Sequence, residues 1–296
     1  MTFLGIDVGG TKVALQTDGG AQPRSAVFPW PQKSSAADDL EALARNVRAL
    51  LDDTPQPVEA VGVAMPATVG PDGLVTTWPG RPSWTGLDLG AALRSLFPGS
   101  RVLWADDGDL AALAEADEAN CPDVVYLGVG TGIGGGIVLG GRPCPGTARG
   151  SCEVGHVIVD PKGQLCDCGR RGCVQAVASG PATLRRAGRL RGEPVSFAEL
   201  AEGIHDERDW AVTAIGESCD ALAVALVNLN ELVRPSLALI GGGFAAGLPG
   251  FAGTVAERAH ALTRPGHPVA HVRAAALGGL SSLRGAVLLA RGPHPG

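Results

Sequence analysis

The sequence predicts an α/β protein made of two similar units. In each half of the chain, an apolar segment typical of a buried strand runs into a glycine-rich turn and returns as a second strand. Helical patterns and further strands follow in both halves, which suggests that the chain contains one architecture twice. The composition fits a globular fold, because hydrophobic residues make up 45% of the 296 residues and charged residues 18%.

In the first half, periodicity predicts four strands and two helices. The strands are expected over residues 2–7, 13–16, 60–65 and 101–104. Leucine, valine and alanine recur at helical spacing between residues 35 and 52, and Ser34 or Ser35 is the expected N-cap of that helix. The second helix is expected to start near Gly108, directly after the last of these strands.

The second half repeats the strand and turn pattern. Its strands are expected over residues 124–127, 137–139 and 237–240. A glycine-rich turn over residues 128–136 separates the first two strands. Long helical patterns cover residues 210–233 and 280–290. We therefore expect a small α/β lobe over residues 1–107, completed by the C-terminal helix at about 280–296, and a large α/β lobe over residues 108–279.

Charge and cysteine content exclude several classes of function. The net charge is −6 and no basic run occurs, so nucleic acid binding has little electrostatic support. No apolar run reaches the length of a membrane span, and the N-terminus lacks a basic leader, so a cytoplasmic protein is expected. Seven cysteines, an odd number in a chain without a signal peptide, argue against a disulfide framework.

Three glycine-rich turns that follow apolar strands predict a nucleotide site. Glycine allows backbone N–H groups to approach phosphate oxygens, and Asp7 at a strand end could hold Mg²⁺ through water. The residues expected to bind ATP are Asp7, Gly9, Gly10, Thr11, Lys12, Gly130, Thr131, Gly132, Gly134, Gly241, Gly242 and Gly243. The alternative for the first turn is an ordinary hairpin. None of the turns matches the P-loop pattern.

One histidine and three crowded cysteines predict a metal site. The expected ligands are His156, Cys166, Cys168 and Cys173. One imidazole and three thiolates form the closed tetrahedral set that structural Zn²⁺ prefers, and Gly169 supplies a bend between them. The alternative is three free thiols in a loop.

Two adjacent carboxylates, Asp106 and Asp107, follow the strand over residues 101–104. Carboxyl ends of strands in α/β sheets often border a ligand crevice, so one of the two could take a proton from an alcohol during phosphoryl transfer. The alternative is helix capping, with Asp107 or Gly108 as the N-cap. Both roles can coexist.

The chain resembles the ROK family of bacterial sugar kinases and repressors over nearly its full length. The segments that carry the resemblance are Asp7–Lys12, Ala105–Asp109, Gly130–Gly134, Glu153–His156, Cys166–Cys173 and Ile240–Gly243. The resemblance implies an actin-like ATPase (ribonuclease H-like) fold of two α/β lobes with a central cleft. It also implies ATP with Mg²⁺ as cofactors, structural Zn²⁺ and a homodimer.

The resemblance also implies roles for single residues. Asp107 would be the catalytic base. Sugar hydroxyls would be bound by Glu153 and His156, and His156 would also ligate zinc. Pro66 and Ala67 occupy positions that lie near the sugar in the family, and the zinc loop would position the sugar.

The chain departs from the family's glucokinases in the residues that would read the sugar. It has Asp106 in place of Asn, Gln175 in place of Glu, Cys152 in place of Gly, and Gly80 in place of Asn. A second carboxylate at position 106 favours a cationic sugar over a neutral one.

We therefore expect ATP-dependent phosphorylation of the 6-hydroxyl of kanosamine, 3-amino-3-deoxy-D-glucose. The family includes kanosamine kinases of antibiotic biosynthesis. Glucose, another amino sugar or a cyclitol is the alternative substrate. The alternative of another class is a sugar-responsive repressor, which is disfavoured because the motif at Asp7 leaves no room for an N-terminal DNA-binding module.

Overall fold

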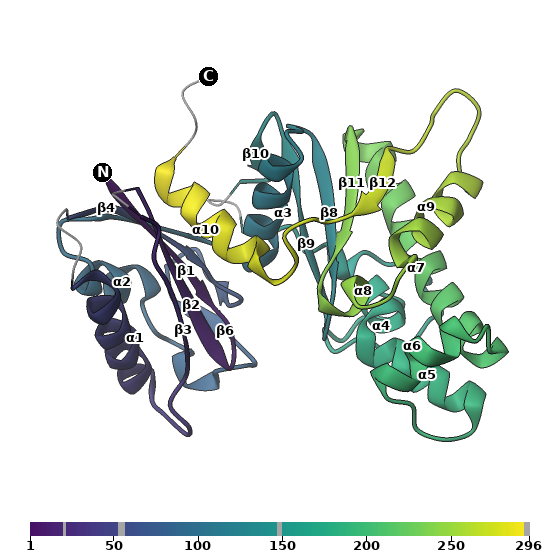
Figure 1. Cartoon of the computed structure of the whole chain (residues 1–296), viewed down its shortest axis with the longest axis horizontal. Coiled ribbons are helices and arrows are strands. Elements are labelled where there is room, and N and C mark those ends of the chain that lie inside the picture. The colour runs from purple at the N-terminus through teal and green to yellow at the C-terminus, as the bar shows by residue number, and fades with distance from the viewer. Residues whose placement is uncertain (20–21, 53–56, 147–149, 293–296) are drawn as a thin grey trace. The chain divides into compact units, whose positions relative to one another are not determined.

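The computed structural model describes the chain except residues 20–21, 53–56, 147–149 and 293–296 (Figure 1). It divides into two compact units, and each is described by itself below. The first unit consists of residues 1–114, 145–151 and 280–296, and the second of residues 115–144 and 152–279. The chain therefore passes from one unit to the other four times.

The first unit contains a five-stranded sheet in the order β3-β2-β1-β4-β7. Its strands are β1 (Thr2–Val8), β2 (Lys12–Asp18), β3 (Ser25–Pro29), β4 (Val58–Ala64) and β7 (Arg101–Ala105). The first three pair antiparallel, whereas β1, β4 and β7 run parallel. A short hairpin, β5 (Thr68–Val69) and β6 (Val75–Thr77), follows β4. All four predicted strands of this half are confirmed.

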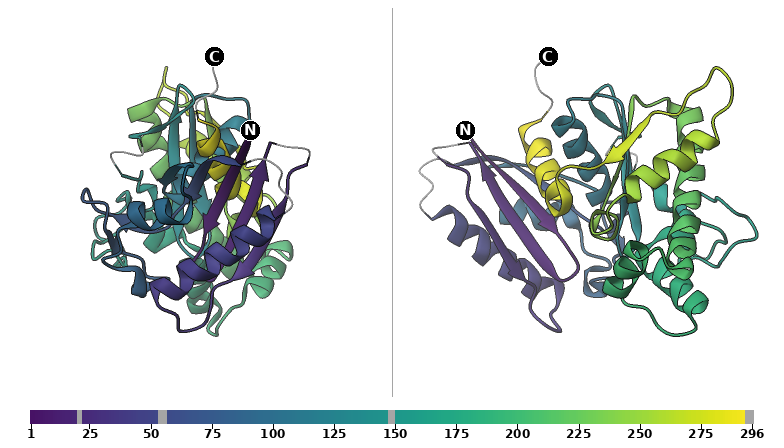
Figure 2. Two further views of the ribbon diagram at one scale, coloured as in Figure 1. Left: turned by 90° about the vertical axis from the view of Figure 1, so that its left-hand side faces the viewer. Right: turned by 45° about the vertical axis from the view of Figure 1, so that its right-hand side comes forward.

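Helices cover both faces of this sheet (Figures 1 and 2). These helices are α1 (Ala36–Leu51), α2 (Leu89–Leu96) and α10 (Ser281–Arg291), whereas α3 (Asp107–Glu118) follows β7 and continues into the second unit. The expected N-cap of α1 is confirmed, because the Ser35 side chain accepts from the Asp38 amide in a capping box. Helix α10 lies on the opposite face from α1 and approaches Gly62 so closely that a Cβ there would meet the Ala286 carbonyl oxygen at 2.0 Å.

The second unit repeats the sheet of the first, strand for strand, in the order β10-β9-β8-β11-β12. Its strands are β8 (Val124–Val129), β9 (Ile133–Leu139), β10 (Arg142–Cys144), β11 (Leu237–Gly241) and β12 (His271–Ala274). Again the first three pair antiparallel and the rest join in parallel. The duplicated architecture expected from the sequence is therefore confirmed.

Helix α7 forms the centre of the second unit's helical layer. The helices of this layer are α4 (Val174–Ala178), α5 (Gly180–Arg191), α6 (Phe197–His205), α7 (Asp209–Val233), α8 (Gly243–Ala246) and α9 (Phe251–Ala261). By length and composition α7 could cross a membrane, so the statement that no apolar run is long enough was wrong. More than half of its most apolar window, 56%, is buried within the protein, as in the core helix of a globular unit.

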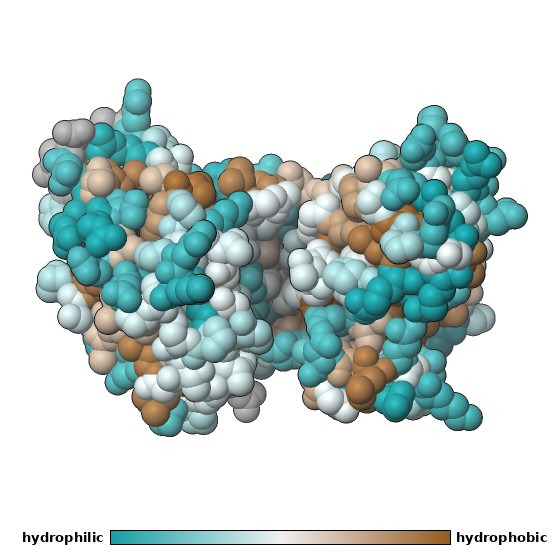
Figure 3. Space-filling model, turned by 90° about the horizontal axis from the view of Figure 1, so that it is seen from below, coloured by the Kyte–Doolittle hydropathy of each residue, from teal (hydrophilic) through white to brown (hydrophobic). Residues whose placement is uncertain are grey.

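Apolar side chains on the face in Figure 3 form separate patches among polar ones, as on most globular surfaces.

One predicted element has different bounds. The sequence suggested that glycine turn residues extend to Gly136 and that the strand begins at Ile137, but β9 begins at Ile133. Gly135 explains the difference, because it has a φ of +157° and a Cβ there would lie 2.1 Å from the Tyr126 carbonyl oxygen. Glycine lets β9 approach β8 closely at this point, so the ladder continues through residues that have the composition of a turn.

Candidate active site

The first glycine turn connects β1 and β2 in the first unit. The Gly9 amide donates to the Lys12 carbonyl oxygen at 2.9 Å, which closes the turn. Thr11 and Lys12 are exposed, so a hydroxyl and a cation lie at the surface beside backbone amides. The geometry is that of a hairpin turn, and it presents the groups that a phosphate needs. The segment can therefore be a hairpin turn and a phosphate-binding turn at the same time.

Three parallel strands bring the predicted carboxylates of this unit to one edge of the sheet. Asp7 pairs in register with Ala64 of β4, and Ala64 pairs with Ala105 of β7. Asp107 begins α3 two residues after Ala105. Burial raises the pKa of Asp7 to about 6, the nearby charge of Asp107 adds to the increase, and Lys12 partly opposes it. Two acidic groups whose charges repel in this way make a suitable place for a divalent cation.

The raised pKa of Asp7 predicts a pH-dependent cost in stability. The ordinary pKa of an aspartate is 3.8, and the pKa of Asp7 in the folded protein is about 6. The stability that protonated Asp7 contributes is therefore fully present below pH 3.8 and is lost as the pH rises through 6. We expect Asp7→Asn to raise the melting temperature by a few degrees at pH 8 without divalent cation, and much less at pH 4, since two pKa units correspond to at most about 3 kcal/mol. Thermal melts across this pH range measure the effect. Asp117→Asn, at an exposed position of α3, is the control, and equal stabilisation at both pH values would contradict the assignment.

Asp106 caps helix α3. Its Oδ1 accepts from the Gly108 amide at 3.0 Å, so the capping residue is Asp106 and not Asp107 or Gly108 as the sequence suggested. The cap belongs one residue earlier because α3 begins at Asp107, directly after the end of β7. Pro66 and Ala67 follow β4, which lies between β1 and β7, so they border the same edge of the sheet.

The second glycine turn connects β8 and β9 in the second unit. The Gly130 amide donates to the Gly132 carbonyl oxygen at 2.9 Å, and the Gly180 amide donates to the Gly130 carbonyl oxygen at 2.9 Å. Gln175, in the first turn of α4, accepts from the Ile133 amide at 3.0 Å. Gly134 lies within β9, opposite Gly128, and Thr131 is exposed at the tip of the turn. Gln175 therefore links the start of α4 to this turn.

The third glycine turn lies beside the second. Gly241 ends β11 and pairs in register with Gly128 of β8. Gly242 has a φ of +84°, and a Cβ there would lie 2.4 Å from the Val129 carbonyl oxygen. Because only glycine fits both that φ and that contact, the chain can turn sharply into α8. A Cβ on Gly243 would meet nothing within 4 Å.

Glu153 precedes a short 3₁₀ turn, Val154–His156, which ends with His156 and packs on the start of β9. Gly155 allows this contact, because a Cβ there would lie 2.0 Å from the Ile133 carbonyl oxygen. The same residue Ile133 donates its amide to Gln175. The segment that carries Glu153 and His156 therefore contacts the strand that follows the second glycine turn.

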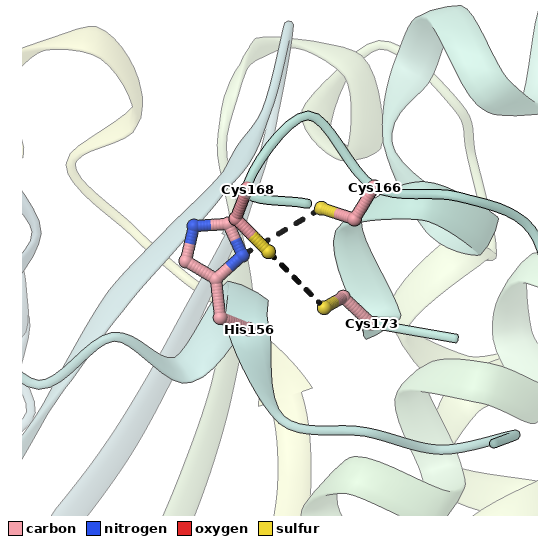
Figure 4. A group of neighbouring side chains, drawn as sticks. All are labelled: His156, Cys166, Cys168 and Cys173. Carbon is pink, nitrogen blue, oxygen red and sulfur yellow. Dashed lines mark hydrogen bonds between the residues drawn. The ribbon is translucent and has the colours of Figure 1, made fainter. Parts of the chain in front are cut away.

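The predicted metal ligands lie together in the second unit (Figure 4). The four ligand atoms of His156, Cys166, Cys168 and Cys173 all lie within 4.8 Å of one another. Cys166 Sγ is 3.7 Å from His156 Nδ1, and Cys168 Sγ is 3.7 Å from Cys173 Sγ. Sulfur atoms around tetrahedral Zn²⁺ lie roughly 3.8 Å apart, given a Zn–S bond of about 2.3 Å. The donor set and its dimensions therefore fit a zinc ion.

Backbone bonds shape the loop that carries these cysteines. The Cys166 amide donates to the Arg170 carbonyl oxygen at 2.7 Å, and the Gly169 amide donates to the Cys166 carbonyl oxygen at 2.9 Å. Gly169 has a φ of +86°, which explains the glycine at the bend. The Arg170 amide also lowers the pKa of the Cys168 thiol to about 7, whereas burial raises that of Cys173 to about 12. A tight turn thus brings three thiols of one short segment toward His156.

The predicted site residues fall into two groups, one in each unit. The first unit holds Asp7, Gly9, Gly10, Thr11, Lys12, Pro66, Ala67, Asp106 and Asp107. The second unit holds Gly130, Thr131, Gly132, Gly134, Glu153, His156, Cys166, Cys168, Cys173, Gln175 and Gly241–Gly243. Sequence reasoning missed Trp30, whose indole Nε1 donates to the Gly9 carbonyl oxygen at 2.7 Å. A long-range contact of this kind leaves no local signal in the sequence.

Comparison with known proteins gives consistent matches along the whole chain. The ROK family profile matches residues 3–292. A kanosamine kinase of Amycolatopsis mediterranei is 56% identical over 97% of this chain and 95% of its own length. A ROK hexokinase of Thermus thermophilus is 30% identical with a TM-score of 0.88, covering 98% of both chains. A ROK glucokinase of Streptomyces griseus, solved with glucose and AMPPNP, is 26% identical with a TM-score of 0.76, covering 99% of this chain and 100% of that one. The fold is that of the actin-like ATPases, in agreement with the repeated strand order.

Proposed function

This chain belongs to the ROK family, and from that premise we propose that it is a kinase that transfers the γ-phosphate of ATP to the 6-hydroxyl of kanosamine. The observation that carries the proposal is the 56% identity to a kanosamine kinase over nearly the whole of both chains. The second candidate is a glucokinase, which the likeness to a glucose-bound ROK structure favours. We further propose that the protein acts in the cytoplasm as a homodimer, within antibiotic biosynthesis.

The glycine turns and Asp7 would hold the nucleotide. Backbone amides of Gly9–Lys12, Gly130–Gly132 and Gly241–Gly243 supply donors for phosphate oxygens. Burial and the charge of Asp107 raise the pKa of Asp7. Beside Mg²⁺ the Asp7 carboxyl group would be ionised again. When bound there, Mg²⁺ would supply positive charge to the phosphate oxygens.

Asp107 would be the base that accepts the proton of the 6-hydroxyl. Its position at the start of α3, beside Asp7, supports this role, because the attacking hydroxyl must meet the phosphate next to the cation. The N-terminus of α3 also favours the negative charge of the base before proton transfer.

Asp106 would read the 3-ammonium group of the sugar. The capping bond from Gly108 fixes the orientation of its carboxylate. A charge-assisted hydrogen bond from an ammonium is worth roughly 1.5–3 kcal/mol, which corresponds to about 10- to 100-fold in affinity. A neutral 3-hydroxyl would gain less from the same carboxylate.

In the second unit, Glu153, His156 and Gln175 would bind the remaining hydroxyls, and Pro66 and Ala67 would border the sugar in the first. We propose that His156 and the three cysteines bind Zn²⁺. The ion would stabilise the loop and would not contact the reacting atoms. Fixing His156 would also fix Glu153, because Glu153 is the N-cap of the short 3₁₀ turn that ends at His156.

The substrate proposal predicts a preference that depends on one carboxylate. We expect kcat/KM for kanosamine to exceed that for glucose by about 10- to 100-fold in wild type, and Asp106→Asn to remove most of this ratio. Asparagine is an equally good N-cap, so α3 should keep its start and the comparison should report charge. Coupled-enzyme assays of ADP release across a sugar panel measure the ratio.

The exposed Asp117→Asn variant serves as the control and should leave the sugar preference unchanged. A wild type that prefers glucose, or an Asp106→Asn variant with the wild-type ratio, would overturn the amino-sugar assignment. Absence of ADP release with every sugar would instead reject the kinase activity.

A further inference from the structure

The first glycine turn is held by a tryptophan outside the motif. The Trp30 indole Nε1 donates to the Gly9 carbonyl oxygen at 2.7 Å, and the Trp30 backbone amide donates to the Thr11 carbonyl oxygen at 3.1 Å. One residue thus binds two of the carbonyls of the turn. Trp30 follows β3, so it reaches the turn from the far side of the β2 strand.

The bond to Gly9 determines the direction of a neighbouring amide. The Gly9 carbonyl and the Gly10 N–H belong to one planar, trans peptide, in which the two groups point in opposite directions. Because the carbonyl points at the buried Trp30 ring, the Gly10 N–H points away from it. The N–H that the motif offers to a phosphate is therefore oriented by a side chain 20 positions later in the chain, at Trp30.

The Trp30 ring is itself fixed in place. It is 5% exposed and makes edge contacts with Phe28 at 5.9 Å and with Trp84 at 6.1 Å between ring centroids. The guanidinium of Arg81 lies over the ring, 5.2 Å from its centroid. Arg81 in turn is paired with Asp39, a carboxylate that is fully buried. A ring held on several sides can hold a hydrogen-bond partner in one direction.

The segment that contains Arg81 also contacts the turn from another side. A Cβ on Gly80 would lie 3.0 Å from the Gly10 Cα, so the two glycine backbones are in van der Waals contact. Any side chain at position 80 would displace the turn or move the segment. Gly80 therefore packs against the turn, and Trp30 donates hydrogen bonds to it.

We propose that Trp30 is a positioning residue for nucleotide binding, which orients the Gly10 amide toward a phosphate of ATP. The proposal rests on the proposed kinase function, in which the first glycine turn binds ATP. Trp30 acts through the turn and touches neither the sugar nor the transferred phosphoryl group.

The test replaces the donor and keeps the ring. We expect Trp30→Phe to raise KM for ATP about tenfold, because the Gly9 carbonyl loses its partner and the Gly10 amide loses its fixed direction. The KM for the sugar and the inhibition constant of adenosine, which has no phosphate, should stay within about twofold. A general loss of structure would change all three constants together.

Trp104→Phe is the control, because Trp104 lies in β7, at the opposite edge of the same sheet from β3 and Trp30. It should lose a donor and leave KM for ATP unchanged. Gly80→Ala tests the same turn from the other side and should also raise KM for ATP, with Trp30 intact.

The outcomes separate this inference from the proposed function. If wild type releases ADP with a sugar, and Trp30→Phe folds with an unchanged KM for ATP, Trp30 has no positioning role. If Trp30→Phe does not fold, an unchanged KM for ATP in Gly80→Ala rejects the proposed control of the turn. If wild type neither binds ATP nor releases ADP, the kinase assignment itself is wrong.

Discussion

Asp107→Asn is expected to slow phosphoryl transfer by roughly 10²–10⁴-fold while the protein stays folded. Asparagine has nearly the same shape as aspartate but cannot accept the proton of the attacking hydroxyl. Removal of this charge should also lower the pKa of Asp7 toward its ordinary value, since the charge of Asp107 contributes to the increase. Single-turnover measurement of ADP formation at saturating ATP and sugar reports the chemical step.

The exposed Asp117→Asn variant controls for charge removal on the same helix and should retain wild-type turnover. The circular dichroism spectrum should be unchanged in Asp107→Asn, because Asp106 and not Asp107 caps α3. Turnover above about a tenth of wild type would remove Asp107 from the role of general base.

Loss of the metal is expected to have the second largest effect. We expect one zinc ion per chain in the purified protein, and Cys168→Ser should release it, because a serine hydroxyl replaces a thiolate ligand. The segment that carries Glu153 and His156 should then loosen, with a fall in melting temperature of roughly 5–15 °C and loss of sugar binding. Elemental analysis measures the zinc, and thermal melts with and without a chelator measure the stability.

Cys121→Ser is the matched control, because Cys121 lies in the same unit and outside the ligand set. It should keep the full zinc content and the sensitivity to chelators. Wild-type protein without zinc, or a Cys168→Ser variant with the wild-type zinc content, would reject the metal site.

Local patterns predicted the strands that lead into the glycine turns and the helices next to them. The N-cap of α1 could be predicted because the capping box of Ser35 lies within four residues. The metal site could be predicted because three of its four ligands lie close together in sequence. The glycine contacts were not visible in the same way. Glycine is needed at positions 135 and 242 because the backbone of another segment of the chain lies against each of them. The spacing of residues in the sequence does not reveal such contacts.

Helices α5 and α6 escaped prediction for different reasons. The buried face of α5 contains Arg186, which is 4% exposed and donates to the carbonyl oxygens of Ala214 and Val177, so the face has the composition of a solvated one. Helix α6 begins with a capping box between Ser196 and Glu199, a signal that the sequence does contain. The tertiary partners of Arg186 could not be read from the sequence, whereas the cap of α6 could have been.

The contact between α10 and the first sheet has a consequence for synthesis of the protein. Gly5 and Gly62, in the first quarter of the chain, are shaped to receive Val287 and Ala286 of this last helix. The second unit ends at Gly279, before α10 begins, so all of its residues are made first. The N-terminal sheet therefore cannot receive α10 on this face until every residue of the second unit has been made. The sheet that is made first thus depends for its packing on a helix that is made after the whole second unit.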